Sequence, residues 1–270
     1  MAEDMVSREG VALAVSLDVT NAFNAIPWAT IMEALQYFGV PAYLVGVIRA
    51  YLSDRWIMYN GKNGEERRAV ERGIPQGSAL GPILWITAYD SVLRCPMPQG
   101  TGMVCYANDT LVLAGRRWWN ETVNLTEDAV ACAIHAIQRL GLSVSPAKSE
   151  ALWFFEHRRR GTPPPELSVT INGEEVPVRR QMKYLSLTID SQWTFGPHFK
   201  LLVPRVIAAA NALCGLVPNI GGAGLGVRRL YVGMVRSRVL YGAPAWAESP
   251  QPNLAEEVAK DDRYPHSEGI

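Results

Sequence analysis

The sequence predicts an α+β fold, a split βαβ sheet of the ferredoxin-like type followed by a smaller helical region. Two observations carry this prediction: residues 11–155 read in the order strand, helix, hairpin, helix, strand, and the pattern beyond Trp193 becomes helical. The 270 residues are 48% hydrophobic and 19% charged, as expected of a globular chain. A sheet of this type places the end of its first strand beside the tip of the hairpin.

The first half of the predicted fold begins with a buried strand. The apolar run GVALAVSLD ends in Asp18 and is typical of a strand that carries a carboxylate at its C-terminal end. Pro27 fits the first turn of a helix, which Gly39 and Pro41 end. The elements expected after it are a helix to about residue 51, a hairpin of residues 56–59 and 67–72, a Gly/Pro-rich loop at 73–82 and an apolar helix at 83–93.

The second half centres on a tight hairpin. Two short apolar runs, 103–107 and 110–114, are separated by Asn108 and Asp109, so both polar side chains are expected at the hairpin tip. The remaining expected elements are a helix at 121–140, a strand at 149–155, a hairpin of 167–171 and 175–178, a strand at 182–189, and helices at 199–216 and 227–240 joined by a Gly-rich segment at 221–224.

Composition points to an intracellular protein, in the cytoplasm or nucleus. Four cysteines without CxxC spacing imply neither a zinc site nor a disulfide framework. No apolar run reaches the length of a membrane span, and the acidic N-terminus does not resemble a signal peptide. Residues 11–247 hold 23 Lys and Arg against 17 Asp and Glu, a modestly basic balance that suits a polyanionic partner and also many solvated surfaces.

The predicted sheet brings Asp18 close to Asn108 and Asp109. Carboxylates that meet at one end of a sheet can hold divalent cations, and Mg²⁺ prefers oxygen ligands of this kind. The alternative is structural: Asp18 caps the following helix, and Asn108 with Asp109 forms an ordinary hairpin turn. The topology alone leaves both interpretations open.

Five ordered motifs resemble those of reverse transcriptases from non-LTR (LINE-type) retrotransposons. They are SLDVTNAFNAIPW at residues 16–28, RGIPQGSALGP at 72–82, YANDT at 106–110, LGLSVSPAKSE at 140–150 and MKYLSL at 182–187. The resemblance covers about residues 10–246, and its order and spacing make it more specific than any single motif. An unrelated ferredoxin-like domain is the alternative, but it gives no reason for five motifs in order.

The resemblance implies a polymerase palm whose metal ligands are Asp18 and Asp109, with Mg²⁺ as the expected ion, two per site in the family. Phe23 matches the bulky side chain that excludes a ribose 2′-hydroxyl, and its alternative is a core aromatic. Gln76 and Gly77 match the loop under the incoming nucleotide and template, which is otherwise a helix-entry turn.

The remaining candidates are basic residues. Lys148 matches the lysine that donates a proton to the pyrophosphate leaving group, with a solvated lysine as the alternative. Arg72, with Arg67 and Arg68, contacts template or nucleotide, or else lies on a solvated hairpin edge. Other arginines could contact the nucleic-acid backbone or else lie on solvated surfaces: Arg158 to Arg160, Arg228, Arg229, Arg236 and Arg238.

Asn108 departs from the motif, because the family has a metal-bridging carboxylate there. An amide oxygen can ligate Mg²⁺ but brings no charge. The loss of one unit charge at about 4 Å, at an effective dielectric near 20, is worth about 4 kcal/mol, or around a thousandfold in occupancy or rate. We therefore expect this copy to be weakly active or inactive as an enzyme. Ser186 replaces a usual glycine, a change expected to be mild.

The expected organisation is a palm with partial fingers at residues 1–190, a helical thumb-like region at 191–250 and a disordered tail at 251–270. The expected partners are an RNA template, a DNA primer and dNTPs, without a membrane. Since the amino-terminal fingers segments of the family have no counterpart here, the sequence is expected to be a truncated piece of a longer polyprotein. The alternative function is a catalytically inactive remnant with at most weak nucleic-acid binding.

Overall fold

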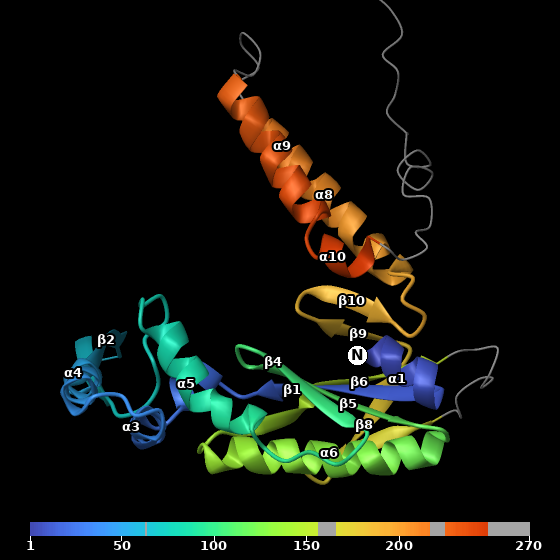
Figure 1. Ribbon diagram of the computed structural model, residues 1–270. Helices are drawn as coiled ribbons and strands as arrows, with labels where there is room; N and C mark the ends of the chain where they lie inside the picture. The colour runs from blue at the N-terminus through green and yellow to red at the C-terminus, as the bar shows by residue number, and fades with distance from the viewer. Residues whose placement is uncertain (63, 156–165, 217–224, 248–270) are drawn as a thin grey trace, which may run out of the picture. The chain divides into compact units, whose positions relative to one another are not determined.

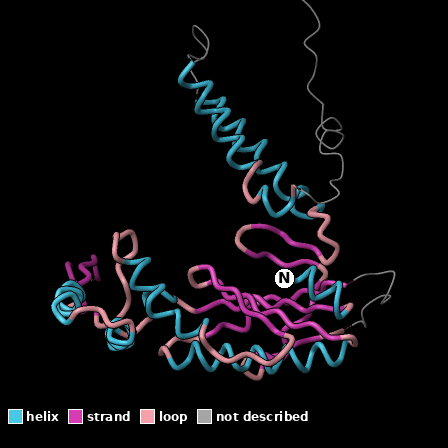
Figure 2. Tube along the Cα trace, in the orientation of Figure 1, coloured by secondary structure: helices cyan, strands magenta, loops and turns pink. Residues whose placement is uncertain are grey.

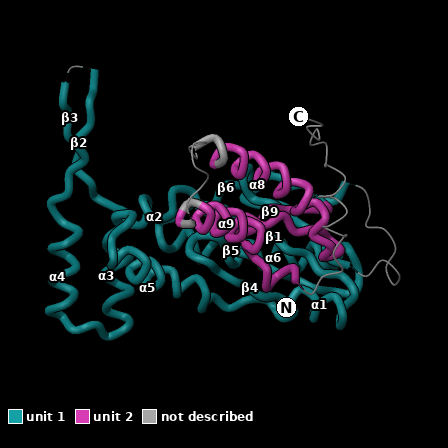
Figure 3. Tube along the Cα trace, turned by 90° about the horizontal axis from the view of Figure 1, so that it is seen from above, with its two compact units in different colours: residues 1–179 teal, residues 180–270 magenta. Residues whose placement is uncertain are grey.

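A computed structural model describes residues 1–62, 64–155, 166–216 and 225–247. The chain forms two compact units, Met1–Arg179 and Arg180–Ile270, which are coloured separately in Figure 3. The expected basic loop at Arg158 to Arg160, the Gly-rich joint at 221–224 and the tail at 251–270 lie outside the described residues.

The first unit is built on a six-stranded sheet in the order β4-β5-β1-β6-β8-β7. The strands β4, β5, β1 and β6 come in the expected order, since the hairpin of β4 and β5 lies on one side of β1 and β6 on the other; all three pairings are antiparallel. The split βαβ sheet is thus confirmed. The strands are β1 Val11–Val19, β4 Thr101–Tyr106, β5 Asp109–Arg116, β6 Val144–Phe155, β7 Ser168–Ile171 and β8 Glu174–Arg179.

The core lies between the sheet and α6 (Trp119–Arg139), which runs along one face (Figure 1). Alternate residues of β1 from Val11 to Val19 point into it, because side chains of a strand alternate between faces. They meet the buried stripe of α6 formed by Ala129, Val130, Ala133, Ile134 and Ile137. Most of this stripe follows the spacing expected of an amphipathic helix.

An N-terminal helix, α1 (Ala2–Glu9), was not predicted from the sequence. It contacts β1, β5 and β6, and Met5 lies against the backbone of Gly115. The helix has eight residues, most of them polar, and only Ala2 is buried in it, so it is too short for a periodic pattern to be recognised. The helix covers part of the face of the sheet opposite α6 (Figure 1).

The segment between β1 and β4 is mainly helical, as the secondary-structure colouring in Figure 2 shows. Pro27 caps α3 (Trp28–Tyr37), Pro41 caps α4 (Ala42–Leu52), and a short α2 (Ala22–Ala25) precedes them. The β2 (Arg55–Gly61) and β3 (Gly64–Val70) strands form the predicted hairpin, whose residues are almost all exposed. The apolar helix α5 (Gly81–Leu93) then leads back to the sheet.

The two predicted hairpins of the sheet differ in whether their turn residues identify the turn in the sequence. The turn between β7 and β8 is Asn172-Gly173, as predicted, and both residues have positive φ angles of 51° and 81°. The turn between β4 and β5 is Ala107-Asn108, since Tyr106 pairs with Asp109. The predicted two-residue tip of Asn108 and Asp109 was therefore wrong by one residue, and Asp109 belongs to β5.

The second unit begins with a hairpin where a single strand was predicted. Residues 182–189 fold into β9 (Gln181–Tyr184) and β10 (Leu187–Asp190) around a turn at Leu185 and Ser186. In the described part of this unit three helices follow, α8 (Gly196–Leu216), α9 (Leu225–Val239) and α10 (Ala243–Trp246). Phe195, Phe199 and Trp246 pack with Leu187 into a separate small core.

Buried Asp190 organises the start of α8. Its carboxylate accepts hydrogen bonds from the backbone N–H groups of Gln192, Thr194 and Phe195. These donors lie at the entry to the helix, where backbone N–H groups have no partner within the helix. These hydrogen bonds account for the buried Asp190 carboxylate without a catalytic or metal-binding role.

Candidate functional site

The two expected metal-binding carboxylates lie on neighbouring strands. Asp18 near the end of β1 pairs directly with Asp109 at the start of β5, although ninety residues of sequence separate them. Residues directly opposite each other in an antiparallel pair have Cβ atoms about 4.5–5.5 Å apart. The pKa of the Asp109 carboxyl lies above its ordinary value, because the side chain is partly buried and the Asp18 charge is close.

Lys148 reaches the same place through a break in the ladder between β1 and β6. Ser16 pairs with Glu150 but Asp18 pairs with Ser145, so the residues between them on β6 bulge out. The Lys148 ammonium lies 3.9 Å from an Asp18 carboxylate oxygen, and its side chain is 70% exposed. An exposed contact of this length contributes little to stability, and the lysine remains free to move.

Ser149 forms hydrogen bonds with a residue of the bulge and with the opposite strand, β1. Its hydroxyl donates to the carbonyl of Ser145 (2.8 Å) and accepts from the backbone N–H of Asp18 (3.4 Å). The serine is buried, so these contacts satisfy a polar group that would otherwise be costly. Sequence reasoning assigned Ser149 only to a strand, because a single serine in an apolar run gives no sign of a bulge.

Asn108 occupies the second position of the hairpin turn, directly before Asp109. The preceding residue, Ala107, has a φ of 54°, a conformation that favours glycine. The positive φ expected of a turn thus falls on Ala107. Asn108 is half-buried and is not under the backbone constraint that favours asparagine in hairpin turns.

The loop at residues 72–82 is anchored to α2. The N–H groups of Gly73 and Ile74 donate to the carbonyls of Ile26 (2.8 Å) and Phe23 (2.7 Å). The indole of Trp28 donates to the Gly73 carbonyl at 2.9 Å. Gln76 and Gly77 form the exposed turn that follows, and no hydrogen bond described for this part of the chain joins them to Asp18 or Asp109.

Phe23 lies in an aromatic stack rather than alone. Its ring stacks on Trp85 of α5 with centroids 4.6 Å apart, and Trp85 stacks on Tyr89 at 5.0 Å. Phe23 is half-buried, whereas Trp85 and Tyr89 are buried. The arrangement leaves part of the Phe23 ring accessible, which fits both a core aromatic and a side chain that borders a nucleotide site.

The basic residues of the prediction are exposed. Arg72 forms a backbone bridge with Pro27 and presents its side chain to solvent. Arg67 lies over the ring of Trp56 on the β2–β3 hairpin, at 4.8 Å. The four arginines of α9, at positions 228, 229, 236 and 238, are all exposed in the second unit.

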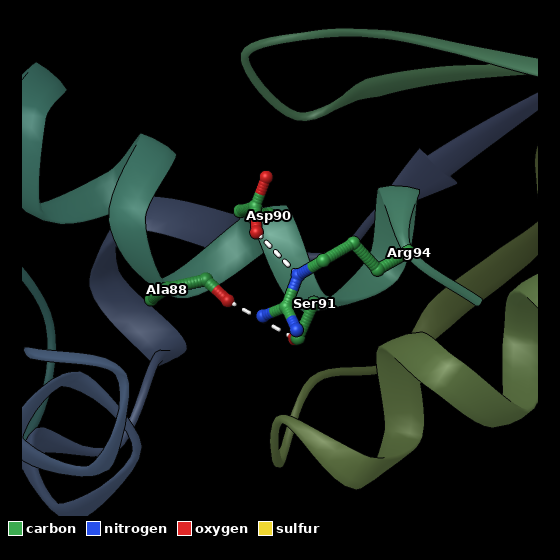
Figure 4. A network of polar contacts seen from close by, with 4 residues as sticks. All are labelled: Ala88, Asp90, Ser91 and Arg94. Atoms are coloured by element: carbon green, nitrogen blue, oxygen red, sulfur yellow. Dashed lines mark hydrogen bonds and ion pairs between the residues drawn. The ribbon is translucent and has the colours of Figure 1, made fainter. Parts of the chain in front are cut away.

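A cavity lies elsewhere in the first unit, between α3, α5 and α6. It has a volume of about 520 Å³, and none of the predicted site residues lines it. Figure 4 shows Arg94, one of two arginines that line it: Arg94 pairs with Asp90 one turn earlier, and Ser91 donates to the carbonyl of Ala88. The Arg94 guanidinium also lies 4.0 Å from the centre of the Tyr37 ring. The arginine is therefore already partnered at the end of its helix.

The donor set around Asp18 fits a hard divalent cation in kind but is short of charge. Asp18 and Asp109 offer two carboxylates, and Asn108, the residue before Asp109, carries an amide; all three supply oxygen donors. In the described part of the chain, no three His, Cys, Asp or Glu side chains are grouped so that they could hold a metal. Cys95, Cys105 and Cys132 are free thiols there. Nor is any described helix long and apolar enough to cross a membrane.

Curated relatives match most of the chain. A retrovirus-related Pol polyprotein from type-1 retrotransposable element R1 of Bradysia coprophila is 24% identical over 87% of this chain, and a probable RNA-directed DNA polymerase from transposon BS of Drosophila melanogaster is 28% identical over 89%. The matched parts are 23% and 27% of those proteins, so the chain spans about a quarter of their length. Elements of this non-LTR class are therefore its relatives.

Solved structures add a distant likeness. Apo telomerase from Candida tropicalis superimposes with a TM-score of 0.49 and 11% identity, over 90% of this chain and 44% of the telomerase chain. The family model described as reverse transcriptase (RNA-dependent DNA polymerase) matches residues 2–189, more than half of the sequence. This chain belongs to the reverse transcriptase family.

Proposed function

We propose that this chain is the palm-containing part of a non-LTR retrotransposon reverse transcriptase whose Mg²⁺-dependent nucleotidyl transfer is impaired by Asn108. The observation that carries the proposal is the direct pairing of Asp18 with Asp109 in a protein of this family. A structural role for both acids does not explain why two carboxylates are held together at a cost to the ionisation of Asp109.

The residues divide the work of the reaction between them. Asp18 and Asp109 would hold the divalent cations, which when bound activate the primer 3′-hydroxyl and stabilise the charge on the reacting phosphate. Phe23 would border the sugar of the incoming dNTP and exclude a 2′-hydroxyl by its volume. The turn at Gln76 and Gly77 would lie under the nucleotide and the RNA template.

Lys148 is suited to the leaving group. Its exposed ammonium can move from Asp18 to a pyrophosphate, because the present contact is long and weak. Proton donation to the departing oxygen would then complete the transfer. In the metal-free protein the same ammonium partly offsets the paired charges of Asp18 and Asp109.

The proposed organisation keeps the palm with partial fingers at 1–190 and a thumb-like helical region at 191–250. The exposed arginines of α9 would contact the phosphate backbone of the primer-template duplex. The turn of Leu185 and Ser186 would lie at the primer end. Since Ser186 has a φ of 66°, which favours glycine, its replacement of glycine costs more than its small size suggests.

The second candidate is an inactive remnant that binds nucleic acid weakly. The specific observation in its favour is the neutral Asn108 beside two crowded carboxylates, which leaves the site one charge short. Both candidates have the same fold, and they differ only in whether the protein retains nucleotidyl-transfer activity.

Primer extension on an RNA template separates the two candidates. We expect the unmodified protein to extend a DNA primer weakly or not at all with Mg²⁺, and Asn108→Asp to gain about 100- to 1,000-fold, because a charge is restored at the site. The matched control is Asn108→Asp combined with Asp18→Ala, which should abolish the gain. Absence of extension by every variant, with Mg²⁺ and with Mn²⁺, would favour the remnant.

A further inference from the structure

A tryptophan of α5 donates a hydrogen bond to the turn that carries Asn108. The indole N–H of Trp85 donates to the carbonyl of Ala107 at 2.9 Å. Trp85 is 1% exposed and is the largest fully buried side chain of the described residues. A buried indole N–H requires an acceptor, and this one uses the backbone of the turn rather than of its own helix.

A second contact from the same helix holds the other side of the turn. Tyr89 lies one helical turn after Trp85, on the same face of α5. Its hydroxyl is 2.7 Å from the Oγ1 atom of Thr110, which follows Asp109. Two side chains of α5 thus form hydrogen bonds with the hairpin, one immediately before Asn108 and one immediately after Asp109.

The turn needs an external hold because its backbone is unfavourable. Ala107 has a φ of 54°, and this left-handed conformation costs an alanine about 1–2 kcal/mol. A conformation of that kind persists only where its surroundings enforce it. The bond from Trp85 acts on the carbonyl of Ala107 itself, so it constrains the peptide that leads into Asn108.

We propose that Trp85 is a positioning residue that fixes the Ala107–Asn108 turn, and with it Asp109, against Asp18, and that its ring ties this turn to Phe23. The inference rests on the proposed function for the role of the acids, but the hold on the hairpin stands on its own geometry. Through the stack of Phe23 on Trp85, a side chain at the proposed nucleotide site and the metal-binding turn share one rigid support.

Hydrogen exchange of Trp85→Phe tests the hold. The phenyl ring can still stack on Phe23, but it lacks the indole N–H that donates to the Ala107 carbonyl and fills less volume than the indole. We expect the amides of Tyr106, Asp109 and Thr110 to exchange about five- to tenfold faster, the effect of one lost hydrogen bond, while those of β1 and β6 stay unchanged. Trp153→Phe is the matched control, since Trp153 is also buried, lies on β6 in the sheet that contains the hairpin, and packs edge-on against Trp119.

The same variants separate this inference from the proposed function. In the Asn108→Asp background, Trp85→Phe should weaken Mn²⁺ binding by about the same factor, measured by electron paramagnetic resonance, while Trp153→Phe leaves it unchanged. If that background binds no Mn²⁺ at all, the proposed function fails, and hairpin exchange alone decides the role of Trp85. Unchanged hairpin exchange, or an equal rise throughout β1 and β6, overturns the inference.

Discussion

At the scale of the residue, the paired acids are the costly feature of this protein. Asp18 and Asp109 lie opposite each other, and the pKa of Asp109 is raised first by burial and then by the charge of Asp18. A stable core has no use for two crowded carboxylates, whereas a cation site requires them. The neutral Asn108 before Asp109 adds no third charge to this pair.

The raised pKa predicts how stability depends on pH. Because the folded carboxyl ionises less readily than the unfolded one, Asp109 lowers stability as the pH rises from its ordinary value near 3.8 through its folded value. Asp109→Asn removes this cost, so its gain in melting temperature should grow between pH 4 and pH 7 in the absence of divalent cations. Thermal unfolding monitored by circular dichroism measures it.

Asp128→Asn provides the control for that comparison. Asp128 lies exposed on α6, so the substitution removes the same charge from open solvent. Its effect on the melting temperature should be small at every pH. A gain from Asp109→Asn that stays constant or shrinks towards neutral pH would contradict the account.

At the scale of the element, the loop at residues 72–82 depends on close packing against α2. Gly73 and Gly77 both have positive φ angles, 85° and 80°. A Cβ atom on Gly73 would lie 2.7 Å from the carbonyl oxygen of Asn24, whereas one on Gly77 would meet nothing within 4 Å. Gly73 is therefore required both by its backbone conformation and by its contact with Asn24, whereas Gly77 is required by its backbone conformation alone.

The two glycines give a matched pair of substitutions. Gly77→Ala should cost about 1–2 kcal/mol, the price of an alanine in the left-handed region. Gly73→Ala carries the same cost and a clash with backbone atoms, so it should lower stability by clearly more and free the loop from α2. Equal losses in urea unfolding would show that the contact with Asn24 is not needed.

The elements that sequence could predict are those with strong periodicity or strong turn signals. The β1 strand, α6 and the Asn172-Gly173 hairpin were all predicted because apolar spacing or positive-φ residues specify them. The hairpin of Ala107 and Asn108 was placed one residue too far on, since alanine gives no turn signal. The helix α1 was missed because it is short and mostly polar. The split of residues 182–189 was missed because its turn is formed by Leu185 and Ser186, without a glycine or asparagine to mark it.

At the scale of the whole molecule, the topology of the sheet assembles the site. The order β4-β5-β1-β6 brings residues from three distant segments to the end of β1, and this juxtaposition could be predicted from the order of elements alone. The contacts that hold them could not, because the bulge at Ser149 and the grip of Trp85 depend on tertiary packing. A match to the reverse transcriptase family over residues 2–189 agrees with the motifs at these positions.

The most direct test of the central claim is a Mn²⁺ titration followed by electron paramagnetic resonance. If Asp18, Asn108 and Asp109 form one cation site that lacks a single carboxylate, Asn108→Asp should bind Mn²⁺ about 100- to 1,000-fold more tightly than the unmodified protein. Adding Asp18→Ala to that variant should remove the gain. Equal affinity of the unmodified protein and Asn108→Asp, or a gain that survives Asp18→Ala, would contradict the claim.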